Sequence, residues 1–140
     1  MEDVLSPFRT QIEMIQQQEK ADVIEHAILL WNIIYSRVLH YQKKFPNWLY
    51  LKHEDLSRNP VAEFKALYKK LGLTFNDQAK SFLKNTTQGQ GIEGVNRNAR
   101  LNINKWTWKL SEEEIHRVFV GTEEVAAHFY GVEDWTKQIF

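Results

Sequence analysis

Hydrophobic positions in the first third of the chain recur with helical spacing. Ser6 and Pro7 have the positions of a helix N-cap and of a first helical residue, and apolar side chains then follow every three or four residues. These signals predict a helix over residues 7–18. A second helix is predicted over residues 20–44, where the apolar side chains cover a face broader than a coiled-coil seam. We expect this longer helix to be buried in the core.

The pattern changes after this helix. Phe45-Pro46-Asn47 ends it, and the four apolar residues Trp48–Leu51, which show no alternation, predict a short strand covered on both faces. Asn59 and Pro60 have the positions of the cap and the first residue of another helix, which Gly72 ends. The order helix, strand, helix predicts the α/β fold class.

The predicted strand lacks convincing neighbours in the sequence. Unpaired buried backbone groups cost ~1–3 kcal/mol each, so a strand buried on both faces needs partner strands. Three interpretations stay open. The chain is a piece of a larger α/β fold, the strand pairs with another copy, or the segment is a short helix or loop.

The C-terminal part contains two further start signals and one long gap between them. Asn76 has the position of a cap for a shorter helix, and residues 85–104 lack a sustained period and contain three glycines, which predicts a long loop. Ser111 and Glu114 have the spacing of a capping box, which predicts the start of a last helix that Gly131 ends.

Composition restricts the classes of function. The 140 residues are 43% hydrophobic, which is enough for one domain with a core, and 18 Lys plus Arg balance 18 Asp plus Glu. No global field therefore draws the protein to nucleic acid or to an anionic membrane, and any anion site must be local. The chain has no cysteine, which excludes disulfides and thiolate chemistry, and no apolar stretch long enough to span a bilayer. We expect a soluble, cytoplasmic protein without nucleic-acid or membrane partners.

Two motifs are weighed against simpler alternatives. Gly89–Gly94 has the spacing G-x-G-x-x-G but follows a predicted helix instead of a strand, so we interpret it as a flexible glycine loop. His53-Glu54-Asp55 follows the predicted strand directly, where open α/β sheets collect ligand sites. Position alone favours a capping or ion-pair cluster there. The histidines show no helical metal-binding pair, so no metal site is predicted.

A basic run without acidic residues is the best candidate for a local anion site. Between Arg97 and Lys109 the basic side chains alternate with asparagines and two tryptophans. Guanidinium groups bind phosphate through two parallel hydrogen bonds, and amides can add more. A solvated loop anchored by its tryptophans explains the pattern equally well, and single-stranded nucleic-acid binding ranks third.

Three segments, taken in order, resemble the sulfotransferase family. They are WLYLKHEDLSRNP (residues 48–60), LGL (71–73), and NKW with LSEEEI (104–106 and 110–115). The best match is to bacterial members. The resemblance implies a P-loop-like α/β fold of which this chain is the mostly helical part, with one short buried parallel-type strand near Trp48–Leu51. It also implies 3′-phosphoadenosine 5′-phosphosulfate as the donor, without a metal, and a hydroxyl or amine of a small molecule as the acceptor.

The resemblance also assigns residues to the donor site. Arg97 and Arg100 fall in the loop that binds the 3′-phosphate of the donor in this family, with Asn98 and Lys105 as helpers. His53 takes the place of the tyrosine that usually lies beside the adenine.

The resemblance covers only what the family places in its C-terminal half. The Gly-rich loop that cradles the phosphosulfate and the catalytic base are not found upstream of Ser6. We therefore expect residues 1–140 to be the C-terminal portion of a sulfotransferase-like domain, inactive alone, with the missing half as its partner and no catalytic residue assigned. The competing interpretation is a non-catalytic helical module that self-associates or binds a partner protein through an apolar surface.

Overall fold

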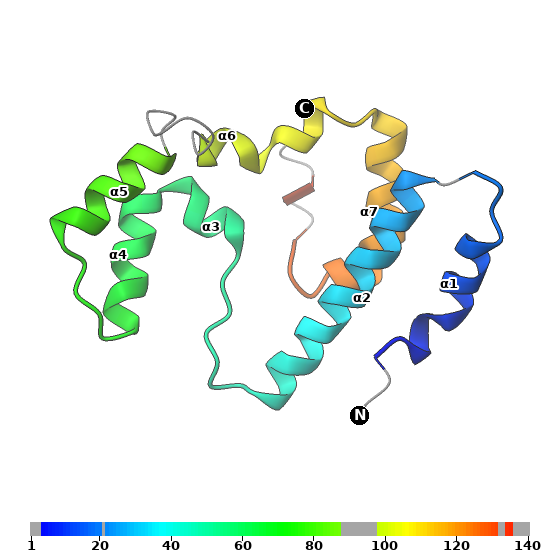
Figure 1. Ribbon diagram of the computed structural model, residues 1–140, viewed down its shortest axis with the longest axis horizontal. Helices are drawn as coiled ribbons and strands as arrows, with labels where there is room; N and C mark the ends of the chain where they lie inside the picture. Colours follow the sequence, from blue (N-terminus) through cyan, green and yellow to red (C-terminus); the bar gives the residue numbers. More distant parts are fainter. Residues whose placement is uncertain (1–3, 21, 88–97, 132–133, 136–140) are drawn as a thin grey trace. The chain divides into compact units, whose positions relative to one another are not determined.

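The computed structural model describes residues 4–20, 22–87, 98–131 and 134–135. The regular elements in these ranges are helices (Figure 1). They are η1 (Ser6–Phe8), α1 (Arg9–Gln16), α2 (Val23–Lys44), α3 (His53–Arg58), α4 (Pro60–Lys70), α5 (Asp77–Thr87), α6 (Ala99–Ile103), η2 (Lys105–Trp108) and α7 (Glu112–Ala126). The chain divides into two compact units, residues 1–48 with 110–140, and residues 49–109.

The predicted α/β class and the strand at Trp48–Leu51 are wrong. The described residues form no strand, and residues 49–52 are irregular. Trp48, Leu49 and Leu51 are 57%, 44% and 49% exposed, so the expected burial on both faces does not occur. Trp48 belongs instead to the turn that ends α2: its N–H donates to the carbonyl of Phe45 at 3.0 Å, and the two rings stack at 4.4 Å between centroids. The apolar run is a loop, and the described part of the chain is all-helical.

The first two helices begin differently from the prediction. Ser6 does not cap a helix but lies inside η1, and α1 ends at Gln16. The long helix α2 begins at Val23, because the side chain of Asp22 accepts hydrogen bonds from the backbone N–H of Ile24 at 2.9 Å and of Glu25 at 3.1 Å. An aspartate in this position satisfies donors that the helix itself leaves free. In the described ranges, no helix has both the length and the apolar character to cross a membrane.

The end of α4 confirms the role predicted for Gly72. Gly72 has a φ of 67°, a left-handed conformation that favours glycine. Its N–H donates to the carbonyl of Lys69 at 3.2 Å, and the N–H of Leu73 donates to that of Tyr68 at 2.8 Å. These two bonds form a Schellman motif, which satisfies the last carbonyls of the helix.

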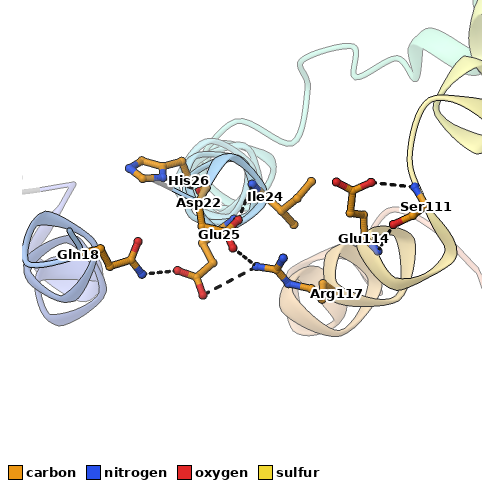
Figure 2. Close-up of polar contacts among 8 residues, drawn as sticks. All are labelled: Gln18, Asp22, Ile24, Glu25, His26, Ser111, Glu114 and Arg117. Atoms are coloured by element: carbon orange, nitrogen blue, oxygen red, sulfur yellow. Dashed lines mark hydrogen bonds and ion pairs between the residues drawn. The ribbon is translucent and has the colours of Figure 1, made fainter. Parts of the chain in front are cut away.

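The capping box at the start of α7 is confirmed as well (Figure 2). The backbone N–H of Ser111 donates to the Glu114 carboxylate at 2.8 Å, and the N–H of Glu114 donates to the Ser111 hydroxyl at 3.2 Å. The long loop predicted over residues 85–104 is only partly right. Helix α5 extends to Thr87 and α6 occupies residues 99–103, while the glycine motif lies outside the described residues.

Helices α2 and α7 pack side by side and run in the same direction (Figure 1). Their contacts advance together along both helices: the side-chain N–H of Asn32 donates to the Gly121 carbonyl at 2.8 Å, and the ring of Tyr35 meets that of Phe129 edge-on at 5.1 Å. A Cβ at Gly121 would lie 2.8 Å from two side-chain carbons of Ile28. The absence of a side chain at Gly121 therefore allows the close approach of the two helices.

The two helices are also joined by charge near their N-terminal ends (Figure 2). The Arg117 guanidinium donates to the Asp22 carboxylate at 2.6 Å and lies 3.9 Å from that of Glu25. The hydrogen bond from Arg117 and those from the backbone N–H groups of Glu25 and Ile24 lower the pKa of Asp22 below its ordinary value of 3.8, against a smaller opposing effect of desolvation. Asp22 thus caps α2 and attaches it to α7.

The close approach predicts that Gly121→Ala destabilises the protein. Alanine normally stabilises a helix interior by about 1 kcal/mol relative to glycine. Here the new methyl group overlaps Ile28, and we expect a net loss of about 1–3 kcal/mol in the free energy of unfolding. Urea unfolding followed by circular dichroism measures it. In an Ile28→Ala background the same substitution should be neutral or stabilising, and strictly additive effects would contradict this account.

The lowered pKa of Asp22 predicts a loss of stability in acid. Because the folded-state pKa lies below the unfolded one, the carboxylate stabilises the fold above pH 3.8, and this contribution is lost as the pH falls through the folded pKa. We expect Asp22→Asn, which keeps a capping oxygen but removes the charge, to flatten this dependence. Urea midpoints measured from about pH 5 to about pH 2.5 test it. Glu123→Gln, on an exposed residue of α7, is the control and should follow the unmodified protein.

Candidate anion-binding site

A polar pocket of about 530 Å³ lies within the unit formed by residues 49–109. Four parts of the chain contribute to it: the end of α3, the start of α4, the end of α5 and the start of α6. Its described lining residues are Ser57, Arg58, Asn59, Pro60, Thr87, Asn98 and Arg100. Two of these are arginines and none is acidic, so the pocket suits an anion.

The break between α3 and α4 places three of the lining residues together. Pro60 has no N–H with which to continue α3, and its fixed φ suits the first position of a new helix. Asn59 accordingly leaves the helical conformation, with φ −143° and ψ 75°. It holds the cap position predicted from the sequence, but its side chain makes no capping hydrogen bond. The amide of Asn59 therefore stays available to a ligand at the pocket wall.

The opposite contribution comes from α6, which packs against α3. Asn98 caps α6: its side-chain oxygen accepts from the N–H of Leu101 at 3.1 Å. This hydrogen bond fixes the start of the helix and with it the backbone that carries Arg100. The Arg100 side chain has no ion-pair partner among the residues that the structure describes.

Arg58 is partly engaged. Its guanidinium donates to the Asp55 carboxylate at 2.8 Å, and the side chains are 59% and 53% exposed. A pair so exposed is screened by solvent and contributes little to stability. A guanidinium has five N–H donors, so Arg58 keeps donors for a ligand.

Ser57 connects the pocket to His53. The Ser57 side chain lines the pocket although the residue is only 4% exposed, and its hydroxyl oxygen lies 3.3 Å from Nε2 of His53, one helical turn earlier. His53 is exposed and is not among the lining residues. It contacts the pocket only through Ser57.

The structure brings together two of the five residues assigned to the donor site. Asn98 and Arg100 line the pocket, and His53 lies behind Ser57. Lys105 begins η2, is exposed, and does not line the pocket. Arg97 lies outside the described residues.

The argument that placed His53 at the end of a strand fails, because the residues before it form a loop. His53-Glu54-Asp55 instead opens α3, and Asp55 makes the kind of ion pair that the simpler interpretation expected. Arg58, Ser57 and Thr87 were missed as site residues. The only sequence signal for Arg58 was its place directly before Asn59-Pro60, where a helix must break. Within the described ranges, no three His, Asp or Glu side chains cluster closely enough to hold a metal ion.

Comparison with known proteins finds sulfotransferases. The chain is 36% identical over 76 residues to carbohydrate sulfotransferase 4 of Mus musculus, which covers 51% of this chain and 20% of that protein. It is 37% identical over 75 residues to carbohydrate sulfotransferase 5 of Homo sapiens, with 49% and 18% covered. For human carbohydrate sulfotransferase 6 the identity is 36% over 76 residues, with 49% and 19% covered.

The extent of this similarity sets its meaning. The chain spans about a fifth of the length of these curated relatives. No protein-family model matches the chain, and no solved structure matches it. The relatives named are animal proteins, so the expected likeness to bacterial members stays a prediction. About half of this chain is thus homologous to animal carbohydrate sulfotransferases.

Proposed function

We propose that this chain is the C-terminal portion of a sulfotransferase-like domain. In the complete enzyme a sulfuryl group passes from 3′-phosphoadenosine 5′-phosphosulfate to a hydroxyl or amine, and the names of the relatives favour a carbohydrate as the acceptor. The observation that carries the proposal is the similarity to carbohydrate sulfotransferases over about half of the chain. In this proposal the chain works with a missing N-terminal half and needs neither a metal nor a nucleic-acid or membrane partner. A cytoplasmic location stays a prediction from the sequence.

The pocket supports one part of this proposal, the binding of the donor nucleotide. A phosphate at the end of a nucleotide is a compact oxyanion, which two arginines and no described carboxylate suit well. We assign Arg100 to the 3′-phosphate together with Arg97, and Asn98 and Lys105 as helpers. His53, held against Ser57, is assigned to the adenine side.

The donor supplies the chemistry, because its phosphosulfate bond is already activated for transfer. The protein must hold donor and acceptor in line and stabilise the transferring group with cations. The sequence offers no Gly-rich loop after a strand to cradle the phosphosulfate, and we assign no catalytic base. We therefore infer that the chain alone binds the nucleotide weakly and does not turn over.

The donor proposal predicts weak, Arg100-dependent binding of adenosine 3′,5′-bisphosphate. A charge-assisted hydrogen bond contributes ~1.5–3 kcal/mol, so Arg100→Ala should raise the Kd by about tenfold or more. Following backbone amides of residues 98–108 by NMR during a titration measures it. Lys80→Ala, which removes an exposed charge of the same unit on α5, should change the Kd little.

Two results would count against the donor proposal. One is an equal effect of Arg100→Ala and Lys80→Ala, which would indicate only general charge attraction. The other is release of nucleotide from the donor by the pure chain in the presence of carbohydrate acceptors. Such turnover would show that this chain holds the base and loop that we consider missing.

A second candidate function, self-association, is favoured by an exposed stripe on α2. The stripe consists of Val23, Ala27, Leu30 and Ile34, and the three larger side chains are 76%, 59% and 49% exposed. Its spacing of four, three and four residues is that of a coiled-coil seam, because α7 covers the remainder of the broad apolar face. A second copy of the chain suits it, since two-fold symmetry lays the same stripe against itself.

Self-association through this stripe predicts that Leu30→Glu combined with Ile34→Glu gives a monomer. Charged side chains in the seam lose the ~25 cal/mol per Å² gained on burying apolar surface. Sedimentation equilibrium at tens of micromolar compares the variant with the unmodified chain. Val120→Glu, on a residue of α7 that is 55% exposed, is the control and should leave the dimer intact. A monomeric unmodified chain would exclude this function.

A further inference from the structure

We propose that the pocket between α3, α4, α5 and α6 is a binding site for a compact tetrahedral dianion, a phosphate or sulfate monoester group, held between Arg58 and Arg100. Arg58 is the new element of the proposal, because neither the sequence nor the resemblance gave it a role. The site shares Arg100 with the proposed donor site, but it rests on the composition of the pocket and does not require the chain to be a sulfotransferase.

The two arginines reach the pocket from separate helices. Arg58 is the last residue of α3, Arg100 lies in α6, and these helices pack against each other within one unit. A guanidinium binds two oxygens of a tetrahedral anion through parallel N–H bonds. Two guanidinium groups on different elements therefore match both the charge and the oxygens of a dianion, which a single arginine cannot do.

The rest of the described lining favours the same ligand. Ser57 and Thr87 bring hydroxyl groups, Asn59 and Asn98 bring amides, and Pro60 is the only apolar lining residue among those described. The described wall thus offers little surface for an apolar group. The side chain of Asn59 makes no capping hydrogen bond, so its amide is free to donate to an anion.

Asp55 gives the proposal a direction that a chance surface cluster would lack. Its carboxylate holds Arg58 at 2.8 Å but does not line the pocket. A bound dianion and this carboxylate compete for one guanidinium, and the exposure of the pair keeps the competition weak. Removing the charge of Asp55 should therefore strengthen anion binding, while removing that of Arg58 should weaken it.

The test is a titration of the complete 140-residue chain with inorganic phosphate at low ionic strength, followed by NMR of backbone amides. We expect shifts at residues 57–59, 87 and 98–100. Arg58→Gln and Arg100→Gln should each raise the Kd about tenfold or more, and Asp55→Asn should lower it about two- to fivefold. Lys65→Gln removes an exposed charge from α4 of the same unit and should change the Kd less than twofold. Circular dichroism melts check that each variant folds, and Arg58→Lys, which keeps the charge without the fork, should retain part of the affinity.

The outcomes separate this inference from the proposed function. If phosphate binding depends on Arg58 and Arg100 but adenosine 3′,5′-bisphosphate binds no more tightly than phosphate, the anion site stands and the donor proposal fails. If the nucleotide binds through Arg100 while Arg58→Gln changes neither Kd, the inference about Arg58 is overturned and the donor proposal stands. Equal effects of Arg58→Gln and Lys65→Gln, or an Asp55→Asn variant that binds phosphate more weakly, would also overturn it.

Discussion

The close approach of α2 and α7 at Gly121 is the contact on which the unit of residues 1–48 and 110–140 depends. Only a residue without a side chain lets Ile28 lie against the α7 backbone, and only at that separation does Asn32 reach the carbonyl of Gly121. The unit has little else in reserve. Its fully buried described residues are Ile115, Thr122 and Ala126, all on α7. In so thin a core, the fit between two helices contributes more to order than the amount of apolar surface does.

Local signals predicted this fold better than long-range ones. The capping box at Ser111 and the turn at Gly72 are complete within a few residues, so the sequence contains all the partners that they need. The run Trp48–Leu51 is different, because four apolar residues form a strand only if other strands pair with them. Nothing local distinguishes such a run from an exposed loop, and here it is a loop. The same limit explains why the α/β class was wrong.

The candidate site divides along the same line. Asn98 and Arg100 were predicted because they lie in one short run that lacks acidic residues, a pattern visible in the sequence. Arg58 lies far from that run and joins it only because α3 packs against α6. Lys105 belongs to the run but does not line the pocket, since η2 directs the chain onward after α6. Sequence reasoning therefore found the charge of the pocket but not its walls.

The parallel arrangement of α2 and α7 has a consequence for how the protein is made. The partners Asn32 and Gly121 are 89 residues apart, and Asp22 and Arg117 are 95 apart. At a synthesis rate of ~5–20 residues per second, α2 exists for roughly 4–18 s before its partner helix is made. Residues 49–109 are contiguous and can fold during that interval, whereas the unit that contains the N-terminus must wait for the last helix. The nascent chain therefore carries an uncovered apolar helix through most of its own translation, which is the period in which chaperone binding matters most.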